Sequence, residues 1–204
     1  MAYRQTEKTK ARQQEVHQAI IDATLALLTD SGFAAVSIRA VAKQAGMATG
    51  SVYKHFASKA ELCAKVFRLA SEEELARVVR QTQGEDSPSQ RLQKSVRGFS
   101  ERAIKQPRLS YALIAEPVDP SVDEERIKLR QDYANAFADL ISEGVAAKEF
   151  VNQQANVSAA ALVGIISETL VVPLSWQQTK LTSKQQTDLI QSIQTLCLRA
   201  LGGK

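Results

Sequence analysis

Cysteine and histidine are scarce in this chain of 204 residues, which contains two of each. Two cysteines exclude a disulfide-rich scaffold and a cysteine-rich zinc site, and two histidines provide no recognisable metal site. Cys63 and Cys197 both lie in apolar helical contexts. We interpret them as buried free thiols, with a functional pair as the alternative, and we expect neither a metal nor a cofactor.

Long uninterrupted apolar runs are also missing from the sequence. The first 30 residues are polar and basic, without an apolar core and a cleavage site, so we expect no signal peptide. The most apolar stretch, residues 157–176, is interrupted by Glu168, Pro173 and several hydroxyl residues, which argues against a membrane span. A cytoplasmic protein with no membrane partner is therefore predicted.

Catalytic signatures are lacking as well. The chain has no Ser/His/Asp grouping, phosphate-binding loop or metal-ligand cluster, so we do not expect an enzyme. Hydrophobic residues make up 44% of the chain and charged residues 24%, which is typical of a folded protein and excludes a largely disordered one.

Positive charge is concentrated at one end of the chain. The formal net charge is +4, but residues 1–68 alone hold ten Lys and Arg against five acids, and the remainder is close to neutral. A basic module that faces a polyanion would have this distribution. A solvated basic surface without a partner is the alternative.

Strand signals are weak, and helical periodicity extends over almost the whole chain. Breaks at glycine and proline predict about nine helices. We expect capping boxes at Ser58–Glu61 and Ser183–Gln186, and a loop at residues 116–120 that contains Pro117 and Pro120. The first expected helix ends near residue 31. The others cover about 37–45, 49–55, 58–83, 89–105, a short segment from 107, 122–147, 154 to 172 or 176, and 183–202.

The spacing of Ala42, Gly46 and Val52 is that of a helix-turn-helix. Ala42 is small where the next helix must cross, Gly46 suits the tight turn, and Val52 can pack the two helices together. A structural helical hairpin produces the same spacing. The basic flank and the short polar helix at residues 49–55 favour DNA binding.

Residues 15–68 resemble the DNA-binding domain of the TetR family of transcriptional regulators. The resemblance is carried by the run 45–62, which reads AGMATGSVYKHFASKAEL, and by Gly32-Phe33 and residues 37–42 upstream. The other two thirds of the chain resembles the family only in helix count and layout.

The resemblance implies an all-α fold, in which a three-helix DNA-binding domain precedes a larger helical domain for ligand binding and dimerisation. The expected organisation is a flexible basic arm at 1–11, the helix-turn-helix domain at 12–57, a connecting helix at 58–83, and the ligand-binding and dimerisation domain at 84–204. Arg4, Lys8, Lys10 and Arg12 of the arm would follow the DNA backbone or the minor groove, with idle solvated charges as the alternative.

The third helix would enter the major groove, with base readers at its exposed start and phosphate contacts around it. Lys59 supports this arrangement, because a cation in the first turn of a helix is disfavoured unless an anion is bound there. Tyr53 could instead be a core-edge aromatic, and His55 could simply close the helix end; Phe56 is expected in the core. The expected DNA-binding residues are Ser37, Thr49, Gly50, Ser51, Tyr53, Lys54, His55 and Lys59.

One position departs from the family pattern. Ala48 occupies the site where the family usually has a hydroxyl residue that caps the third helix. Thr49 would then take over the capping, and this would withdraw it from base contact.

The last two predicted helices are apolar over too broad an arc for one buried face, so one stripe should pack internally and another outward. By resemblance, the outward stripes form a four-helix bundle across a two-fold axis, with a fully internal core as the alternative. The expected dimer interface is Leu162, Ile166, Leu170, Ile193, Leu196 and Ala200.

An effector pocket is expected to be enclosed by the fifth to eighth helices, with aromatic walls and a few polar anchors. Its candidate residues are Phe99, Tyr111, Glu116, Arg130, Tyr133, Phe137, Glu168 and Trp176. The resemblance thus implies a dimeric, ligand-responsive regulator, by default a repressor, which binds a palindromic operator and is released by a small hydrophobic or amphipathic effector. A helical interaction module without DNA contact is the rival hypothesis.

Overall fold

A computed structural model describes residues 7–175 and 181–203 of the chain. These residues form nine α-helices and one 3-10 helix, with no strand among them, so the predicted all-α fold is confirmed. The elements are α1 (Glu7–Ser31), η1 (Phe33–Ala35), α2 (Ile38–Gln44), α3 (Thr49–Tyr53), α4 (Lys59–Thr82), α5 (Pro88–Lys105), α6 (Pro107–Ile114), α7 (Pro120–Ala146), α8 (Ala155–Leu174) and α9 (Ser183–Ala200).

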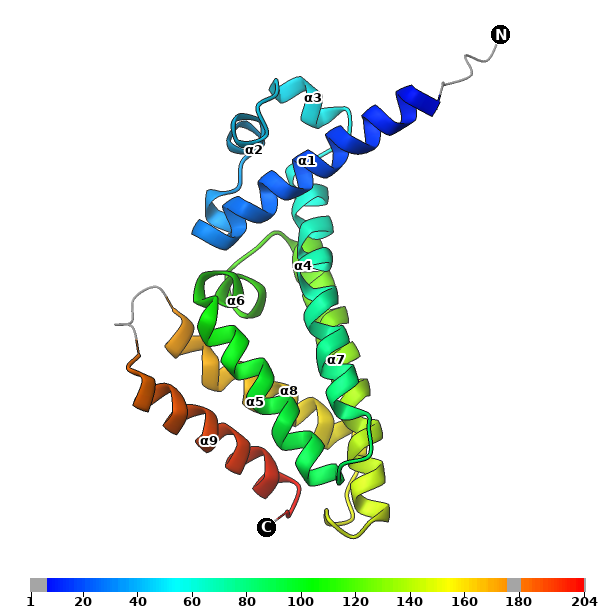
Figure 1. The fold of residues 1–204 in the computed structure, drawn as a ribbon, viewed down its shortest axis with the longest axis vertical. Coiled ribbons are helices and arrows are strands. Elements are labelled where there is room, and N and C mark those ends of the chain that lie inside the picture. Colours follow the sequence, from blue (N-terminus) through cyan, green and yellow to red (C-terminus); the bar gives the residue numbers. More distant parts are fainter. Residues whose placement is uncertain (1–6, 176–180, 204) are drawn as a thin grey trace.

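The helices are arranged along one long axis (Figure 1). Helices α1, α2 and α3 lie at one end, and α5, α8 and α9 lie at the other, with α6 between the two groups. Helix α4 runs along the long axis beside α7 and contributes to both hydrophobic cores: Phe67 is buried in the N-terminal core and Val78 in the C-terminal core. Because α4 is one continuous helix, a tilt at either end is transmitted to the other.

The N-terminal core is not closed by the first four helices alone. Ala112 of α6 and Val122 of α7 are buried within it, beside residues of α1 and α4. The two ends of the molecule therefore share a packed junction at α6 and the start of α7. The helix-turn-helix end rests directly on the rest of the chain.

Helix starts follow the capping rules, with two adjustments to the predicted boxes. Ser58 Oγ accepts the amide of Glu61, but the Glu61 carboxylate reaches back to the amide of Ala57 instead of Ser58. The box at α9 begins one residue earlier than predicted, at Thr182, and a further box at Ser87 opens α5. Hydroxyl residues are adjacent at 182 and 183, so sequence alone places this cap only to within one residue.

The predicted arm and loop are each shorter than expected. The expectation of a flexible arm at 1–11 is wrong for residues 7–11, which are helical in α1, whereas Arg4 lies outside the described residues. Pro120 belongs to α7 instead of the preceding loop, because proline is tolerated in the first turn and Asp119 caps the helix.

Both cysteines are buried free thiols, as the residue pattern indicated. Burial raises the pKa of Cys63 to about 11 and that of Cys197 to about 12. Both side chains therefore stay protonated at neutral pH, and a protonated thiol is a poor nucleophile.

Helix α8 combines an internal and an external apolar face. By length and composition alone α8 could cross a membrane, but core helices of soluble proteins meet the same criteria. Leu162, Ile166 and Leu170 are buried against the rest of the chain, and so is Ile193 of α9. The expectation that these four residues form a dimer interface is therefore wrong, since their own chain already covers them.

Candidate DNA-binding surface and effector cavity

The helix-turn-helix is built as its spacing predicted. Val41, Ala42 and Val52 are fully buried between α2 and α3. Gly46 adopts φ +64° in the turn, a conformation that other residues rarely accept, and the amide of Met47 donates to the carbonyl of Ala42. This packing fixes the direction of α3 relative to α2.

The start of α3 projects into solvent. Thr49, Gly50 and Lys54 are exposed and Ser51 is half-buried. A Cβ added to Gly50 would meet nothing within 4 Å, so the backbone here is open to a close-approaching surface. No side chain caps the helix at Ala48, and Thr49 lies in its first turn. Capping therefore does not withdraw Thr49 from the exposed face.

Tyr53 is 55% exposed, which excludes the core-edge alternative for this residue. Phe56, by contrast, is buried as predicted and stacks on His17 of α1, with ring centroids 4.8 Å apart. His55 is half-buried, and its ring centroid lies 5.7 Å from that of His17. His55 thus closes the end of α3 against α1 while part of its ring faces outward.

Two further predicted contact residues lie at helix starts. Ser37 caps α2, with its Oγ 3.1 Å from the amide of Ala40, and it remains exposed. Lys59 is the first residue of α4 and is also exposed. A cation at this position repels the positive end of the helix dipole, and a bound anion would remove that conflict.

A small cavity of about 60 Å³ lies inside the C-terminal half, between α4, α5, α6, α7 and α8. Its wall is almost entirely apolar and includes Phe99, Phe137 and Val163. Tyr133 packs edge-on against Phe99, with ring centroids 6.0 Å apart, and burial raises its pKa. We call this cavity of about 60 Å³ the inner cavity.

A larger, more polar space of about 460 Å³ adjoins the inner cavity and shares its wall residues Phe99, Leu113 and Tyr133. We call it the vestibule. Arg102 of α5 crosses its wall to Glu74 of α4, with Nε and Nη2 at 2.7 and 2.5 Å from the carboxylate oxygens. The two spaces together offer an apolar interior behind a charged rim.

The predicted effector residues are only partly brought together. Phe99, Arg130, Tyr133 and Phe137 line the inner cavity. Tyr111 packs against the C-terminal core instead, and Glu168 lies exposed on the outer face of α8. Trp176 lies outside the described residues.

Glu116 also lies outside the cavity that it was predicted to line. Its carboxylate accepts hydrogen bonds from the amides of Phe33 and Ala34, so it joins the α6–α7 loop to η1 and does not line either cavity. These partners are 83 and 82 residues away in the sequence, beyond the reach of any local pattern.

Arg126 and Leu129 of α7 also line the inner cavity but were not predicted, although the sequence carries a signal for Arg126. Arg126 lies four residues before Arg130, seven before Tyr133 and eleven before Phe137, which places all four on one helix face. The same spacing could have been read from the sequence once Tyr133 and Phe137 were singled out.

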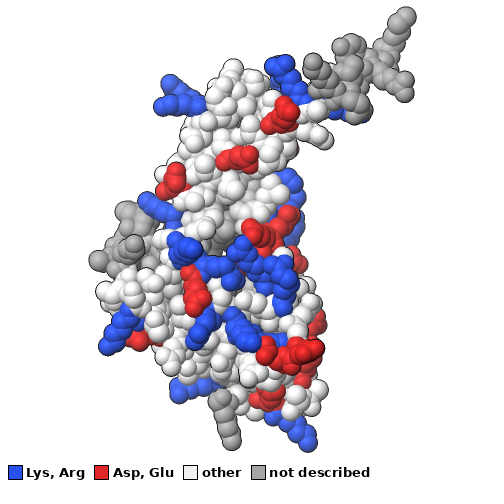
Figure 2. Space-filling view, in the orientation of Figure 1, with Lys and Arg blue, Asp and Glu red and all other residues white. Residues whose placement is uncertain are grey.

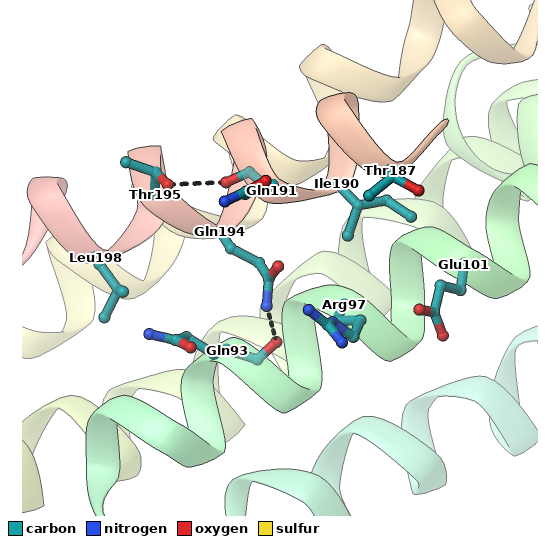
Figure 3. Close-up of a pocket in the computed structure, with 9 residues that line it drawn as sticks. All are labelled: Gln93, Arg97, Glu101, Thr187, Ile190, Gln191, Gln194, Thr195 and Leu198. Carbon is teal, nitrogen blue, oxygen red and sulfur yellow. Dashed lines mark hydrogen bonds between the residues drawn. The ribbon is translucent and has the colours of Figure 1, made fainter. Parts of the chain in front are cut away.

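A third space is an open groove of about 490 Å³ between α5 and α9 (Figure 3). Its lining is mostly polar, and Gln194 of α9 donates to the carbonyl of Gln93 across it. This hydrogen bond fastens α9 to α5. A polar surface groove of this kind does not match the apolar pocket expected for a hydrophobic effector.

Charge on the molecular surface is not confined to the helix-turn-helix end. Figure 2 shows Lys and Arg gathered across the middle of one face, at the level of α6, with acidic side chains beside them. The vestibule is itself lined by the cations Arg77, Arg102 and Lys105. The N-terminal end carries more widely separated cations in the same view.

Comparison with known families agrees with this arrangement. The family described as bacterial regulatory proteins, tetR family, matches residues 20–66, and the tetracyclin repressor-like C-terminal domain matches residues 85–170. The chain belongs to the TetR family. It is thus related to helix-turn-helix transcriptional regulators, and its relatives are not enzymes.

Curated TetR-family relatives include several repressors. The repressor KstR of Mycolicibacterium smegmatis is 34% identical over 101 residues, 50% of each chain. KstR of Mycobacterium tuberculosis is 29% identical over 134 residues, 65% of this chain and 61% of its own. The regulator AcrR of Shigella flexneri is 36% identical over 63 residues, 31% of this chain and 29% of its own. The matched part of this chain thus spans between a quarter and three fifths of these relatives.

Solved structures show the same fold over nearly the whole chain. FadR of Bacillus subtilis in complex with stearoyl-CoA has a TM-score of 0.75 at 18% identity, covering 90% of this chain and 98% of its own. RolR in complex with resorcinol has a TM-score of 0.70 at 15% identity, covering 96% and 91%. At these identities the likeness establishes the fold alone.

Proposed function

We propose that this TetR-family protein is a ligand-responsive transcriptional repressor in the cytoplasm. It binds a palindromic operator as a homodimer and is released by a small, mainly hydrophobic effector. The observation that carries the proposal is the exposed start of α3, where Thr49, Gly50 and Lys54 project beyond a rigid support. An α-helix presented in this way fits the major groove, where base edges can be read.

Within this proposal, Thr49, Gly50, Ser51 and Lys54 contact base edges. Tyr53, His55, Ser37 and Lys59 surround α3 and bind backbone phosphates, which sets the register of the protein on the duplex. One short helix reads few base pairs, so a second copy at a two-fold related half-site is needed for useful specificity.

The dimer uses the outer faces of α8 and α9. Val157, Gly164 and Val172 share one exposed stripe of α8, because they are spaced by seven and eight residues. Val157 and Val172 are 63% and 59% exposed, and Leu196 on α9 is 46% exposed. Apolar side chains gathered on the exposed faces of neighbouring helices favour burial against a second copy. Ala200 is also exposed, so it and Leu196 remain interface candidates.

The effector enters through the vestibule and places its apolar part in the inner cavity. At about 60 Å³ the inner cavity is far below the ~300–1,000 Å³ of typical ligand pockets. The described state is therefore closed, and effector binding has to move its walls. An effector that fits only the expanded form binds it more tightly than the closed form, and this difference in affinity is what allows a ligand to shift DNA affinity.

The test begins with selection of duplexes from a random pool by the full chain, followed by titration of the selected duplex. The proposal predicts a palindromic consensus and a stoichiometry of one dimer per site. Stearoyl-CoA, which the solved FadR structure contains, and resorcinol serve as the large and small effector probes. Enrichment of no common sequence would contradict the proposed function.

A further inference from the structure

The contacts around the α6–α7 loop point to a route from the inner cavity to the DNA-binding end. We propose that Glu116 is the positioning residue that couples the two, and that Arg126 controls it from the cavity wall. This inference rests on the proposed function, since it assigns the residues through which an effector would act. The hydrogen bonds of the two residues go to η1, to α6 and to Asp123 and Glu116, not to α3.

Glu116 binds two adjacent backbone amides of η1. Its Oε2 accepts the amide of Phe33 at 3.0 Å, and its Oε1 accepts the amide of Ala34 at 2.9 Å. The first amides of a short helix have no partner within that helix, and a carboxylate satisfies them strongly. We call this pair of bonds the η1 clamp.

Gly32 makes room for the η1 clamp. A Cβ added at this position would lie 2.5 Å from Glu116 Oε2, and the residue adopts φ +78°. Both conditions favour glycine here. The backbone before η1 is therefore shaped to receive the Glu116 carboxylate, and the chain continues from η1 directly into α2 of the helix-turn-helix.

Arg126 holds the other side of the same loop. Its Nη2 donates to the carbonyl of Glu116 at 2.8 Å and to that of Ala112 at 3.2 Å, and its Nε donates to Leu113 at 3.0 Å. The same side chain lines the inner cavity. Arg126 thus connects the cavity wall to the end of α6 and to the backbone of the residue that forms the η1 clamp.

The contacts close into a ring through two aromatic residues. The guanidinium of Arg126 lies 6.0 Å from the ring centroid of Phe67 on α4, and Phe67 stacks with Phe33 at 6.4 Å. Phe33 carries one of the two clamped amides. Phe67 thus packs beside the η1 clamp, and the proposed route from Arg126 to η1 runs through the backbone and the carboxylate of Glu116.

These contacts predict what effector entry does. The inner cavity has to expand, and Arg126 lies in the part of its wall that also carries α6. When Arg126 moves, the carbonyl of Glu116 loses its donor, the η1 clamp loosens, and η1 with α2 changes its angle to the rest of the chain. Two recognition helices at a fixed spacing in a dimer cannot tolerate such a change without loss of affinity.

Amide hydrogen exchange at Phe33 and Ala34 tests this route without an operator or an effector. In Glu116→Ala, exchange of both amides accelerates by about 10- to 100-fold, the range for loss of hydrogen bonds to a charged acceptor. Glu116→Gln retains one acceptor oxygen and falls between this variant and the wild type. Amides of the buried residues Ile20 and Leu28 in α1 report whether the domain stays folded.

The decisive variant is Arg126→Met, which keeps a long side chain in the cavity wall but removes the donors. It is expected to accelerate exchange at Phe33 and Ala34, although it contacts neither amide. Arg130→Met is the matched control, because Arg130 lines the same cavity and reaches only the carbonyl of Ile114, at 3.5 Å. Glu124→Gln, at an exposed position of α7, controls for loss of a carboxylate charge.

Val163→Phe on the α8 side of the inner cavity imitates occupancy and should act in the same direction. If the route runs through the η1 clamp, neither Arg126→Met nor Val163→Phe accelerates exchange further in a Glu116→Ala background. Unchanged exchange at Phe33 and Ala34 in Arg126→Met, or additive effects in the double variants, would overturn the inference. Failure to select any duplex would overturn the proposed function and leave this exchange result independent of it.

Discussion

His17 of α1 lies between two aromatic partners at the end of α3: its ring stacks on Phe56 at 4.8 Å and stands 5.7 Å from His55. Burial lowers the pKa of His17, and the neighbouring His55 and Lys65 lower it further. The neutral imidazole is thus the form that the folded DNA-binding end prefers. Protonation of His17 would place a positive charge near Lys65.

The first prediction concerns pH. The folded-state pKa of His17 lies below its unfolded value of about 6.5, so the folded state binds fewer protons than the unfolded state in this range. The associated stability is complete above the unfolded pKa and is lost as the pH falls through the folded pKa. Denaturant titrations from neutral to mildly acidic pH should show this decrease, and His17→Phe should make the curve flatter. An equally steep decrease in His17→Phe would refute the assignment.

The second prediction separates phosphate contacts by charge. In a dimer, Lys59→Ala removes two phosphate contacts, so the slope of log affinity against log salt becomes shallower by about 0.9 for each. Tyr53→Phe removes a neutral donor from each copy, weakens binding by up to about tenfold per copy, and leaves the slope unchanged. Fluorescence anisotropy over a salt series measures both quantities. The exposed Lys43→Ala is the charge-matched control; a slope change equal to that of Lys59→Ala would contradict a specific role for Lys59.

The third prediction concerns Arg102 and Glu74, which join α5 to α4 across the vestibule. Their side chains are 28% and 22% exposed, so loss of one partner leaves the other partly desolvated. Glu74→Gln should lower the free energy of unfolding by about 1–3 kcal/mol, whereas Glu73→Gln at a 74% exposed side chain should cost less than about 1 kcal/mol. Chemical denaturation distinguishes the two. Equal decreases in the free energy of unfolding would show that the Glu74–Arg102 pair stabilises the fold no more than an exposed carboxylate does.

The fourth prediction separates the interface from the core of α8. Among the described residues, no atom beyond its own helix lies within 4 Å of a Cβ added at Gly164, so Gly164→Arg should fold normally and shift the protein to monomer. Leu162→Ala should instead cost about 2–5 kcal/mol of stability and leave the oligomeric state unchanged. Light scattering after gel filtration reads the mass. Ile127→Glu, at a 63% exposed position of α7, is the control. A Gly164→Arg variant that remains dimeric would show that this face of α8 does not form the interface.

The fold was predictable because its signals are local. Gly46, Ala42 and Val52 define the helix-turn-helix by spacing alone, and helix ends follow from Ser37, Ser58 and the prolines. Each of these signals operates within a few residues, where backbone geometry leaves few choices. Helix α8 shows the limit: apolar periodicity there describes two stripes, and only tertiary packing decides which one Leu162 occupies.

The candidate sites could be predicted where their residues lie close together in the sequence, and less well where distant segments form them. Exposure of Tyr53 and Lys54 follows from a short helix with one buried face. The inner cavity is lined by five helices, so Phe99, Tyr133 and Phe137 could be proposed as aromatic wall residues while Glu116 was wrongly included. Its partners Phe33 and Ala34 lie in another part of the chain, and a carboxylate near a predicted pocket looks the same in sequence whichever way it turns.

The central claim is that this chain reads a specific DNA sequence through α3. Anisotropy titration at physiological salt, with the selected palindrome and a scrambled duplex of equal composition, tests it most directly. The wild-type protein should prefer the palindrome by about 10³-fold or more. Lys54→Ala or Ser51→Ala should reduce the discrimination between bases at the single position that each residue contacts. Equal affinity of the wild-type protein for both duplexes would contradict the central claim.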